Sequence, residues 1–284
     1  MRTQILGRLG LDEVRLSEEL IRSRDFEFAE QYAEFQCGRR PWQTCMLWSG
    51  GGEVGDGVIA HYDTGQPSRP TIFAERVPYI RRLVEEHFAT EHLLFCRMVV
   101  MSANVLVPHR DFLEFGERPA EASPTHRLHV PLATGEDCLF LEDNVVYRML
   151  PGEVWSLDVT RIHSAAVLCD TRRVHLILDF ADVPEERLLR FTPNREVGIP
   201  DRNLVARPPL SEREQDAILG LAGVIDLENL SEVLGMVIKK QYRRDGGDNY
   251  VWAVMDQIGR SSGNRGVQAR IRELHRHCTL ERDE

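Results

Sequence analysis

The sequence has no run of about 18 apolar residues, so nothing in it predicts a membrane-spanning helix. Its first residues also lack the continuous apolar segment and small-residue cleavage site of a secretory signal peptide. We therefore expect a cytoplasmic protein that does not associate with membranes.

Cysteine pairs and excess positive charge are missing too. The six cysteines are scattered and form no Cys-x-x-Cys motif, which argues against a zinc ribbon or a disulfide scaffold and predicts reduced thiols. Only Lys239 and Lys240 are lysines, and the formal net charge is −10. A field of that sign repels polyanions, so we expect no nucleic-acid partner.

What is present is an ordinary globular composition, with 284 residues that are 42% hydrophobic and 28% charged. Apolar spacing predicts short helices over 11–22 and 77–87, separated by a loop-rich stretch in which Ser49-Gly50-Gly51-Gly52 is a plain turn. Short apolar runs between turn residues then predict strands over 94–101, 127–132, 138–141, 145–149, 154–158 and 174–180.

These strands predict a mainly β core of the jelly-roll or cupin type with flanking helices. After about residue 204 the period becomes helical, beginning with the capping box Ser211-Glu212-Arg213-Glu214. We expect one domain over 1–203 and a helical subdomain over 204–284.

The strongest chemical signal is Pro108-His109-Arg110-Asp111, directly after an apolar run. Side chains two apart in an extended segment point to one side, so His109 and Asp111 can converge. A second histidine, His163, follows a later group of strands. Two histidines and one carboxylate form the facial triad that binds non-haem Fe(II) and leaves positions open for other ligands.

Further polar side chains on the predicted strands are expected to lie near this triad. Arg173 follows ten residues after His163 and begins a predicted strand, where its guanidinium suits the carboxylate of a chelating 2-oxo acid. Period two places His175 on the same face as Arg173. It also places Arg127 and His129 together, opposite an apolar face, as candidate contacts for the metal ligands or for the co-substrate.

Several motifs occur in a fixed order along the chain: His109-Arg110-Asp111, Pro151-Gly152-Glu153-Val154-Trp155-Ser156-Leu157-Asp158, His163-Ser164-Ala165 and Arg173. Together they resemble the Fe(II)/2-oxoglutarate-dependent hydroxylases of free L-proline, within the wider aspartyl/asparaginyl β-hydroxylase-like group. The N-terminal Ile5-Leu6-Gly7, the stretch 32–39 and the helical C-terminal third look similar as well, so the resemblance covers most of the chain.

The resemblance implies a double-stranded β-helix in which His109, Asp111 and His163 bind Fe(II). It implies that Arg173 holds the distal carboxylate of 2-oxoglutarate, with Arg127 and His129 as further contacts. O2 is then the second co-substrate, and ascorbate is the reductant expected in vitro.

The substrate implied is a small free cyclic L-amino acid, either L-proline or L-pipecolic acid, hydroxylated for the biosynthesis of a secondary metabolite. Arg97 is the candidate for its carboxylate, Trp155 for a wall of the pocket and Arg118 for a loop that closes over it. Within this resemblance, the loop 117–125 looks longer than the corresponding loop of the cis-4-hydroxylases, which leaves the identity of the substrate open. A homodimer is kept open as the assembly.

Three alternatives remain at this point. The first is a hydroxylase of another free or carrier-bound amino acid. The second is a non-catalytic cupin-like binding module, although none of the three metal ligands is missing. The third is a dioxygenase with three or four histidine ligands, which would need His129 as a ligand.

Overall fold

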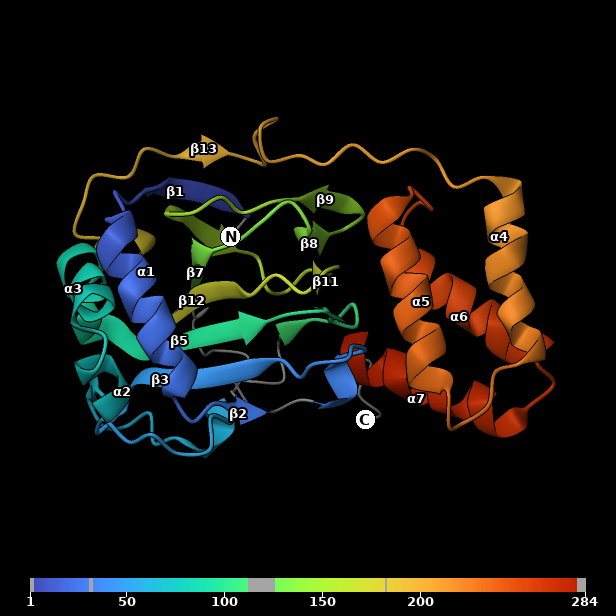
Figure 1. Cartoon of the computed structure of the whole chain (residues 1–284), viewed down its shortest axis with the longest axis horizontal. Helices are drawn as coiled ribbons and strands as arrows, with labels where there is room; N and C mark the ends of the chain where they lie inside the picture. The colour runs from blue at the N-terminus through green and yellow to red at the C-terminus, as the bar shows by residue number, and fades with distance from the viewer. Residues whose placement is uncertain (1–2, 31–32, 112–125, 182, 280–284) are drawn as a thin grey trace.

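A computed structural model describes residues 3–30, 33–111, 126–181 and 183–279. Two antiparallel sheets form its centre, with helices at both ends (Figure 1). The larger sheet has the strand order β13-β1-β10-β7-β12-β5-β3-β2, with β4 paired to β3. Its strands are β1 (Gln4–Arg8), β2 (Ala29–Glu30), β3 (Gln43–Gly50), β4 (Ser68–Pro70), β5 (Leu93–Met101), β7 (His126–Ala133), β10 (Glu153–Leu157), β12 (Arg173–Phe180) and β13 (Glu196–Val197).

The smaller sheet has the order β6-β11-β8-β9. Its strands are β6 (Asn104–Val105), β8 (Cys138–Glu142), β9 (Val145–Tyr147) and β11 (His163–Val167). The predicted jelly-roll core of the double-stranded β-helix type is confirmed by these two antiparallel sheets.

Helices α1 (Glu13–Arg22), α2 (Ile72–Glu75) and α3 (Pro78–His87) cover the outer face of the larger sheet. Alternate residues of each strand meet them: Leu128 and Val130 of β7 and Leu176 and Leu178 of β12 pack in one core with residues of these helices. Because side chains alternate along a strand, the intervening residues of β7 and β12 face the smaller sheet. That inner face carries the polar residues of the site.

The C-terminal helices are α4 (Glu212–Leu219), α5 (Leu230–Arg243), α6 (Tyr250–Ser261) and α7 (Arg265–Thr279). The predicted capping box is confirmed, since the Glu214 N–H donates to the Ser211 hydroxyl and the Glu214 carboxylate accepts from the Ser211 N–H. Val237 of α5 and Trp252 of α6 share a core with Val105 and Ala166 of the smaller sheet. This helical region therefore packs directly on the strands that lead to the metal-ligand candidates.

The structure adds detail to two expectations about the N-terminal region. The stretch between the first two helices is not only loops, because it contains β3, which pairs with β5. The turn predicted at 49–52 is confined to Gly51 and Gly52, whose φ angles are +68° and +81°, while Ser49 and Gly50 end β3. The six cysteines are free, as expected. In the part of the chain described, no helix is both long and apolar enough to span a membrane.

Candidate metal centre

Backbone pairing brings the two histidines of the predicted triad together. His109 and His163 form an isolated antiparallel bridge, in which the N–H of each donates to the carbonyl oxygen of the other at 2.9 Å. Their ring centroids are 4.6 Å apart. Asp111 is buried beside them, and one ligand atom from each of the three residues lies within 4.8 Å of the others.

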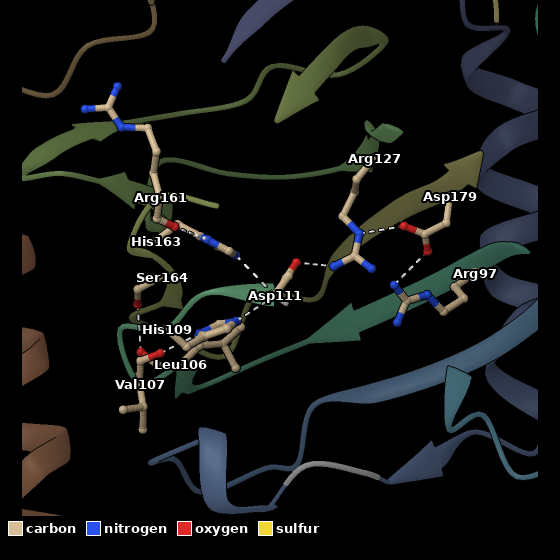
Figure 2. A network of polar contacts seen from close by, with 10 residues as sticks. All are labelled: Arg97, Leu106, Val107, His109, Asp111, Arg127, Arg161, His163, Ser164 and Asp179. Atoms are coloured by element: carbon tan, nitrogen blue, oxygen red, sulfur yellow. Dashed lines mark hydrogen bonds and ion pairs between the residues drawn. The ribbon is translucent and has the colours of Figure 1, made fainter. Parts of the chain in front are cut away.

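Each imidazole is oriented by a main-chain carbonyl near it in sequence (Figure 2). His109 Nδ1 lies 2.6 Å from the Val107 oxygen, and His163 Nδ1 lies 3.0 Å from the Arg161 oxygen. A carbonyl oxygen can only accept, so both Nδ1 atoms carry a proton, and Nε2 is the nitrogen of each ring left to bind a metal ion. These Nε2 atoms are 3.2 and 3.5 Å from Asp111 Oδ1, so the three donor atoms converge.

The charge of Asp111 is maintained by its neighbours. Burial by itself would raise the pKa of this carboxyl, but Arg127 and the two histidines hold it well below its ordinary value. Arg127 Nη1 donates to Asp111 Oδ2, the oxygen that faces away from the histidines. Burial lowers the pKa of His163, but the Asp111 carboxylate outweighs it and raises the pKa. An ionised carboxylate and two imidazole nitrogens are the donors of a facial Fe(II) site.

The triad opens on a cavity of about 270 Å³ between the two sheets. The polar lining consists of the triad, the adjacent Arg110 and inward-facing residues of β5, β7 and β12. The remaining walls are apolar. The lining residues are Phe35, Trp42, Val58, Arg97, Val99, Leu106, His109, Arg110, Asp111, Arg127, His129, Phe140, His163, Ala165, Arg173 and Ile177.

Arg173 is a buried cation that has no carboxylate partner among the described residues. Arg173 is only 5% exposed, and its Nη2 donates to His175 Nδ1 at 3.1 Å. Burial lowers the pKa of this guanidinium to about 10, so it stays charged at neutral pH. A buried charge without a partner is costly, which makes this position suited to an anionic ligand.

The two neighbouring histidines are neutral. Burial, and then the charge of Arg173, hold the pKa values of His129 and His175 well below 6.5. His129 Nδ1 and His175 Nε2 are buried and have no hydrogen-bond partner within the described residues. Unsatisfied polar atoms beside an uncompensated cation indicate a place for a polar, anionic molecule.

Arg97 and Arg127 both bind the Asp179 carboxylate. Arg97 is fully buried, and its Nη2 donates to Asp179 Oδ2 at 2.9 Å. Arg127 Nε donates to Asp179 Oδ1 at 2.6 Å (Figure 2). Both arginines also line the cavity, so their contacts with substrate and co-substrate stay predictions.

The expectation that Trp155 walls the pocket needs correction. Its side chain is fully buried, stacks on Tyr147 with centroids 5.1 Å apart, and donates from Nε1 to Glu153 at 3.0 Å. Tyr147 in turn contacts Phe140, which does line the cavity. Trp155 thus lies two rings behind the wall. Arg118 lies outside the described residues.

Asp179 is a polar residue of this region to which the sequence assigned no role. A signal for it exists, because it follows Arg173 and His175 at period two in a strand that is otherwise apolar. A charged residue on the inward face of a buried strand requires a partner. The partners themselves, Arg97 and Arg127, come from neighbouring strands.

The C-terminal helices contact the segments that carry the metal-ligand candidates. Trp252 Nε1 donates to the Pro108 oxygen at 3.3 Å, next to His109. The Tyr242 hydroxyl donates at 2.9 Å to the Ser164 hydroxyl, which donates to the Leu106 oxygen at 2.7 Å. The helical region therefore supports both sides of the His109–His163 bridge.

Known proteins match this chain along most of its length. The family model for aspartyl/asparaginyl beta-hydroxylase matches residues 12–182, and the model for the C-terminal part of L-proline 3-hydroxylase matches residues 185–284. An L-proline cis-4-hydroxylase of Rhizobium meliloti is 31% identical over 97% of this chain and 95% of its own. L-proline cis-3-hydroxylase 1 of a Streptomyces species is 30% identical over 96% and 94%.

Among solved structures, a prolyl-4-hydroxylase of Pseudomonas putida is similar at a TM-score of 0.37 and 14% identity, over 64% of this chain and 92% of that one. A likeness that remote says nothing of function, whereas the sequence matches extend from the first helix to the last. The chain therefore belongs to the aspartyl/asparaginyl beta-hydroxylase family, in the group of the L-proline hydroxylases.

Proposed function

We propose that the protein is a non-haem iron dioxygenase that uses 2-oxoglutarate and O2 to hydroxylate a ring carbon of a free cyclic L-amino acid. One observation carries the proposal. The His109, Asp111 and His163 donors open on the same cavity as Arg173, a buried cation with no carboxylate partner in the described part of the chain. A metal site alone has no need of that cation.

The donor set fits Fe(II). His109 and His163 would bind it through Nε2, since each Nδ1 proton is held by a carbonyl, and Asp111 would bind through Oδ1. Bound Fe(II), with 2-oxoglutarate and O2, supplies the oxidation that inserts one oxygen atom into a C–H bond, with succinate and CO2 as co-products.

The remaining residues bind and orient the reactants. Arg173 would bind the distal carboxylate of 2-oxoglutarate with two parallel N–H donors, and His175 holds the guanidinium in place from Nδ1. His129 is neutral and has an unsatisfied nitrogen, so it would add a polar contact to 2-oxoglutarate while Arg173 remains the cation that binds the carboxylate. Arg173, His129 and His175 are all buried, and a charge interaction is stronger in a buried site than in water.

We propose L-proline or its six-membered homologue L-pipecolic acid as the substrate. The similarity to L-proline cis-4- and cis-3-hydroxylases supports an amino acid of this kind. Apolar side chains such as Val99, Leu106 and Ile177 suit the methylene groups of a small ring, and Arg97 lies in the same cavity for its carboxylate. We place the reaction in the cytoplasm, within the biosynthesis of a secondary metabolite.

We also propose a division of labour along the chain. The part up to residue 203 supplies the ligands and the cavity, and the helical subdomain over 204–284 supports them. The contacts of Trp252 with Pro108 and of Tyr242 with Ser164 support this division.

The test is one aerobic reaction containing Fe(II), ascorbate, 2-oxoglutarate and equal amounts of L-proline and L-pipecolic acid, analysed by mass spectrometry. We expect one of the two to gain a single oxygen atom, with an equal amount of succinate formed. Asp111→Ala, which removes the carboxylate ligand, serves as the inactive control.

The outcomes separate the parts of the proposal. If succinate forms but neither amino acid is oxidised, the iron and 2-oxoglutarate chemistry is supported and the proposed substrate is wrong. A wider panel of free and carrier-bound amino acids would then be tested. If the wild-type protein neither binds Fe(II) nor consumes 2-oxoglutarate, the enzyme proposal fails and a binding module replaces it.

A further inference from the structure

Asp179 is a fully buried carboxylate whose two oxygens are bound by two different arginines. It lies on β12, between β5 and β7, and its Cα is paired with that of Arg127 on β7. Oδ1 accepts from Arg127 Nε at 2.6 Å, and Oδ2 accepts from Arg97 Nη2 at 2.9 Å. Asp179 thus fixes the position of the Arg127 guanidinium from the side opposite to the metal-ligand candidates.

The same guanidinium reaches the predicted metal ligand. Arg127 uses Nε for Asp179 and Nη1 for Asp111 Oδ2 (Figure 2). The other oxygen, Asp111 Oδ1, faces the Nε2 atoms of His109 and His163. The two oxygens of Asp111 therefore have separate partners, and Arg127 determines which one is left for a metal ion.

We propose that Asp179 is a positioning residue for the metal centre and acts through Arg127; this rests on the proposed function, in which Asp111 is a metal ligand. Asp179 holds the guanidinium so that it engages only Asp111 Oδ2, which leaves Oδ1 to the metal. The negative charge of Asp179 also partly neutralises the positive charge of Arg127. Without the Asp179 charge, all of the Arg127 charge acts on Asp111, and this carboxylate becomes a weaker ligand.

The experiment measures binding of Co(II) alone to the full-length metal-free protein, by its visible absorption bands and by competition with a chelator. This readout does not depend on turnover. We expect Asp179→Asn, which keeps the shape and removes the charge, to weaken Co(II) binding about 10- to 100-fold and to alter the bands, the range known for partners that orient metal ligands.

A matched control is Glu153→Gln. Glu153 is also a buried carboxylate on a strand of the larger sheet, but it binds Trp155, Asn203 and Arg202 and does not line the cavity. It should lose stability while binding Co(II) with the wild-type affinity and spectrum. A loss of affinity shared by both variants would mean a general structural effect and would overturn the proposal.

A double-mutant cycle tests the route through Arg127. If Asp179 acts by this route, Asp179→Asn should cause little further loss of Co(II) affinity in an Arg127→Gln background. Full additivity of the two effects on Co(II) affinity would overturn the route.

A second variant covers the case in which Asp179→Asn does not fold. In Arg127→Lys a single ammonium replaces the fork that bridges the two carboxylates, so Co(II) binding should again weaken and its bands should change. A folded Asp179→Asn or Arg127→Lys protein with wild-type Co(II) affinity and bands would refute the inference. If the wild-type protein itself binds no Co(II), the proposed function fails first.

Discussion

Replacing Arg173 by methionine should produce two changes of opposite sign. Methionine keeps an unbranched side chain of similar reach and removes the buried charge. The pKa of Arg173 is lowered from 12.5 to about 10 by burial, and at 1.36 kcal/mol per pKa unit this corresponds to about 3 kcal/mol of unfavourable burial. Loss of the hydrogen bond to His175 offsets about 1 kcal/mol of this. The ligand-free variant should therefore be more stable than the wild type by about 2 kcal/mol.

The same substitution should nearly abolish 2-oxoglutarate binding. Removing one partner of a buried, hydrogen-bonded charge pair costs about 2–5 kcal/mol, which is roughly a 30- to 5000-fold loss of affinity. Binding is measured by anaerobic titration calorimetry of the Fe(II) protein with 2-oxoglutarate, and stability by urea unfolding of the ligand-free protein.

Arg172→Met is the matched control. The Arg172 side chain is half-buried and points away from the cavity, toward the Leu20 oxygen, the Ser23 hydroxyl and the ring of Phe28. It should bind 2-oxoglutarate normally and gain no stability. An Arg173→Met protein that binds 2-oxoglutarate with wild-type affinity would refute the assignment of the anion site, and one that is less stable than the wild type would refute the cost ascribed to the charge.

Three further predictions follow from the site and its surroundings. Burial and the charge of Arg173 hold the pKa of His175 well below 6.5, so below that pH the unfolded chain binds a proton that the folded chain does not. The free energy of unfolding therefore falls as pH falls. Between about pH 7.5 and about pH 5.5, His175→Gln should make this fall about 1 kcal/mol smaller than in the wild type, as measured by urea unfolding. An unchanged fall would contradict this prediction. Trp155→Phe should lower the free energy of unfolding by about 2 kcal/mol, through lost packing and the lost bond to Glu153, without changing the KM for the amino acid; a tenfold higher KM would return Trp155 to the cavity wall. In the presence of Co(II) at about 100 times its Kd, the bound metal should stabilise the protein by about 2.7 kcal/mol, and adding a chelator should remove this and lower the melting temperature. An unaltered melting curve would argue against a metal site in the native fold.

Local patterns in the sequence were sufficient to predict the inward face of the site strands. Period two put Arg127 and His129 on one face of β7 and Leu128 and Val130 on the other, and the structure confirms this division. The pattern did not say which face is solvated, because both are buried: one under helices and the other under the second sheet.

The missed strand β3 has the same cause. Its run Cys45-Met46-Leu47-Trp48 is buried on both faces, so it shows no alternation and resembles any short apolar segment. Burial on both sides removes the signal that period-based prediction depends on.

Contacts between distant strands could not be predicted from residue types. Asp179 meets Arg97 and Arg127 because β12 lies between β5 and β7 with a particular register, and no local pattern specifies that register. Trp155 is the candidate for a wall of the cavity on sequence alone, whereas Tyr147 and Phe140 lie between it and the cavity.

The bridge between His109 and His163 also affects the order of events during synthesis. The two backbone hydrogen bonds join segments that are separated along the chain by β7, β8, β9 and β10, which must be synthesised before His163. Contacts so distant along the chain form late in folding, because closing a long loop costs entropy that only the finished sheets repay. A growing chain therefore has its ligands apart, and we expect iron to enter only a completed protein. A partly folded chain is then spared from carrying a redox-active ion.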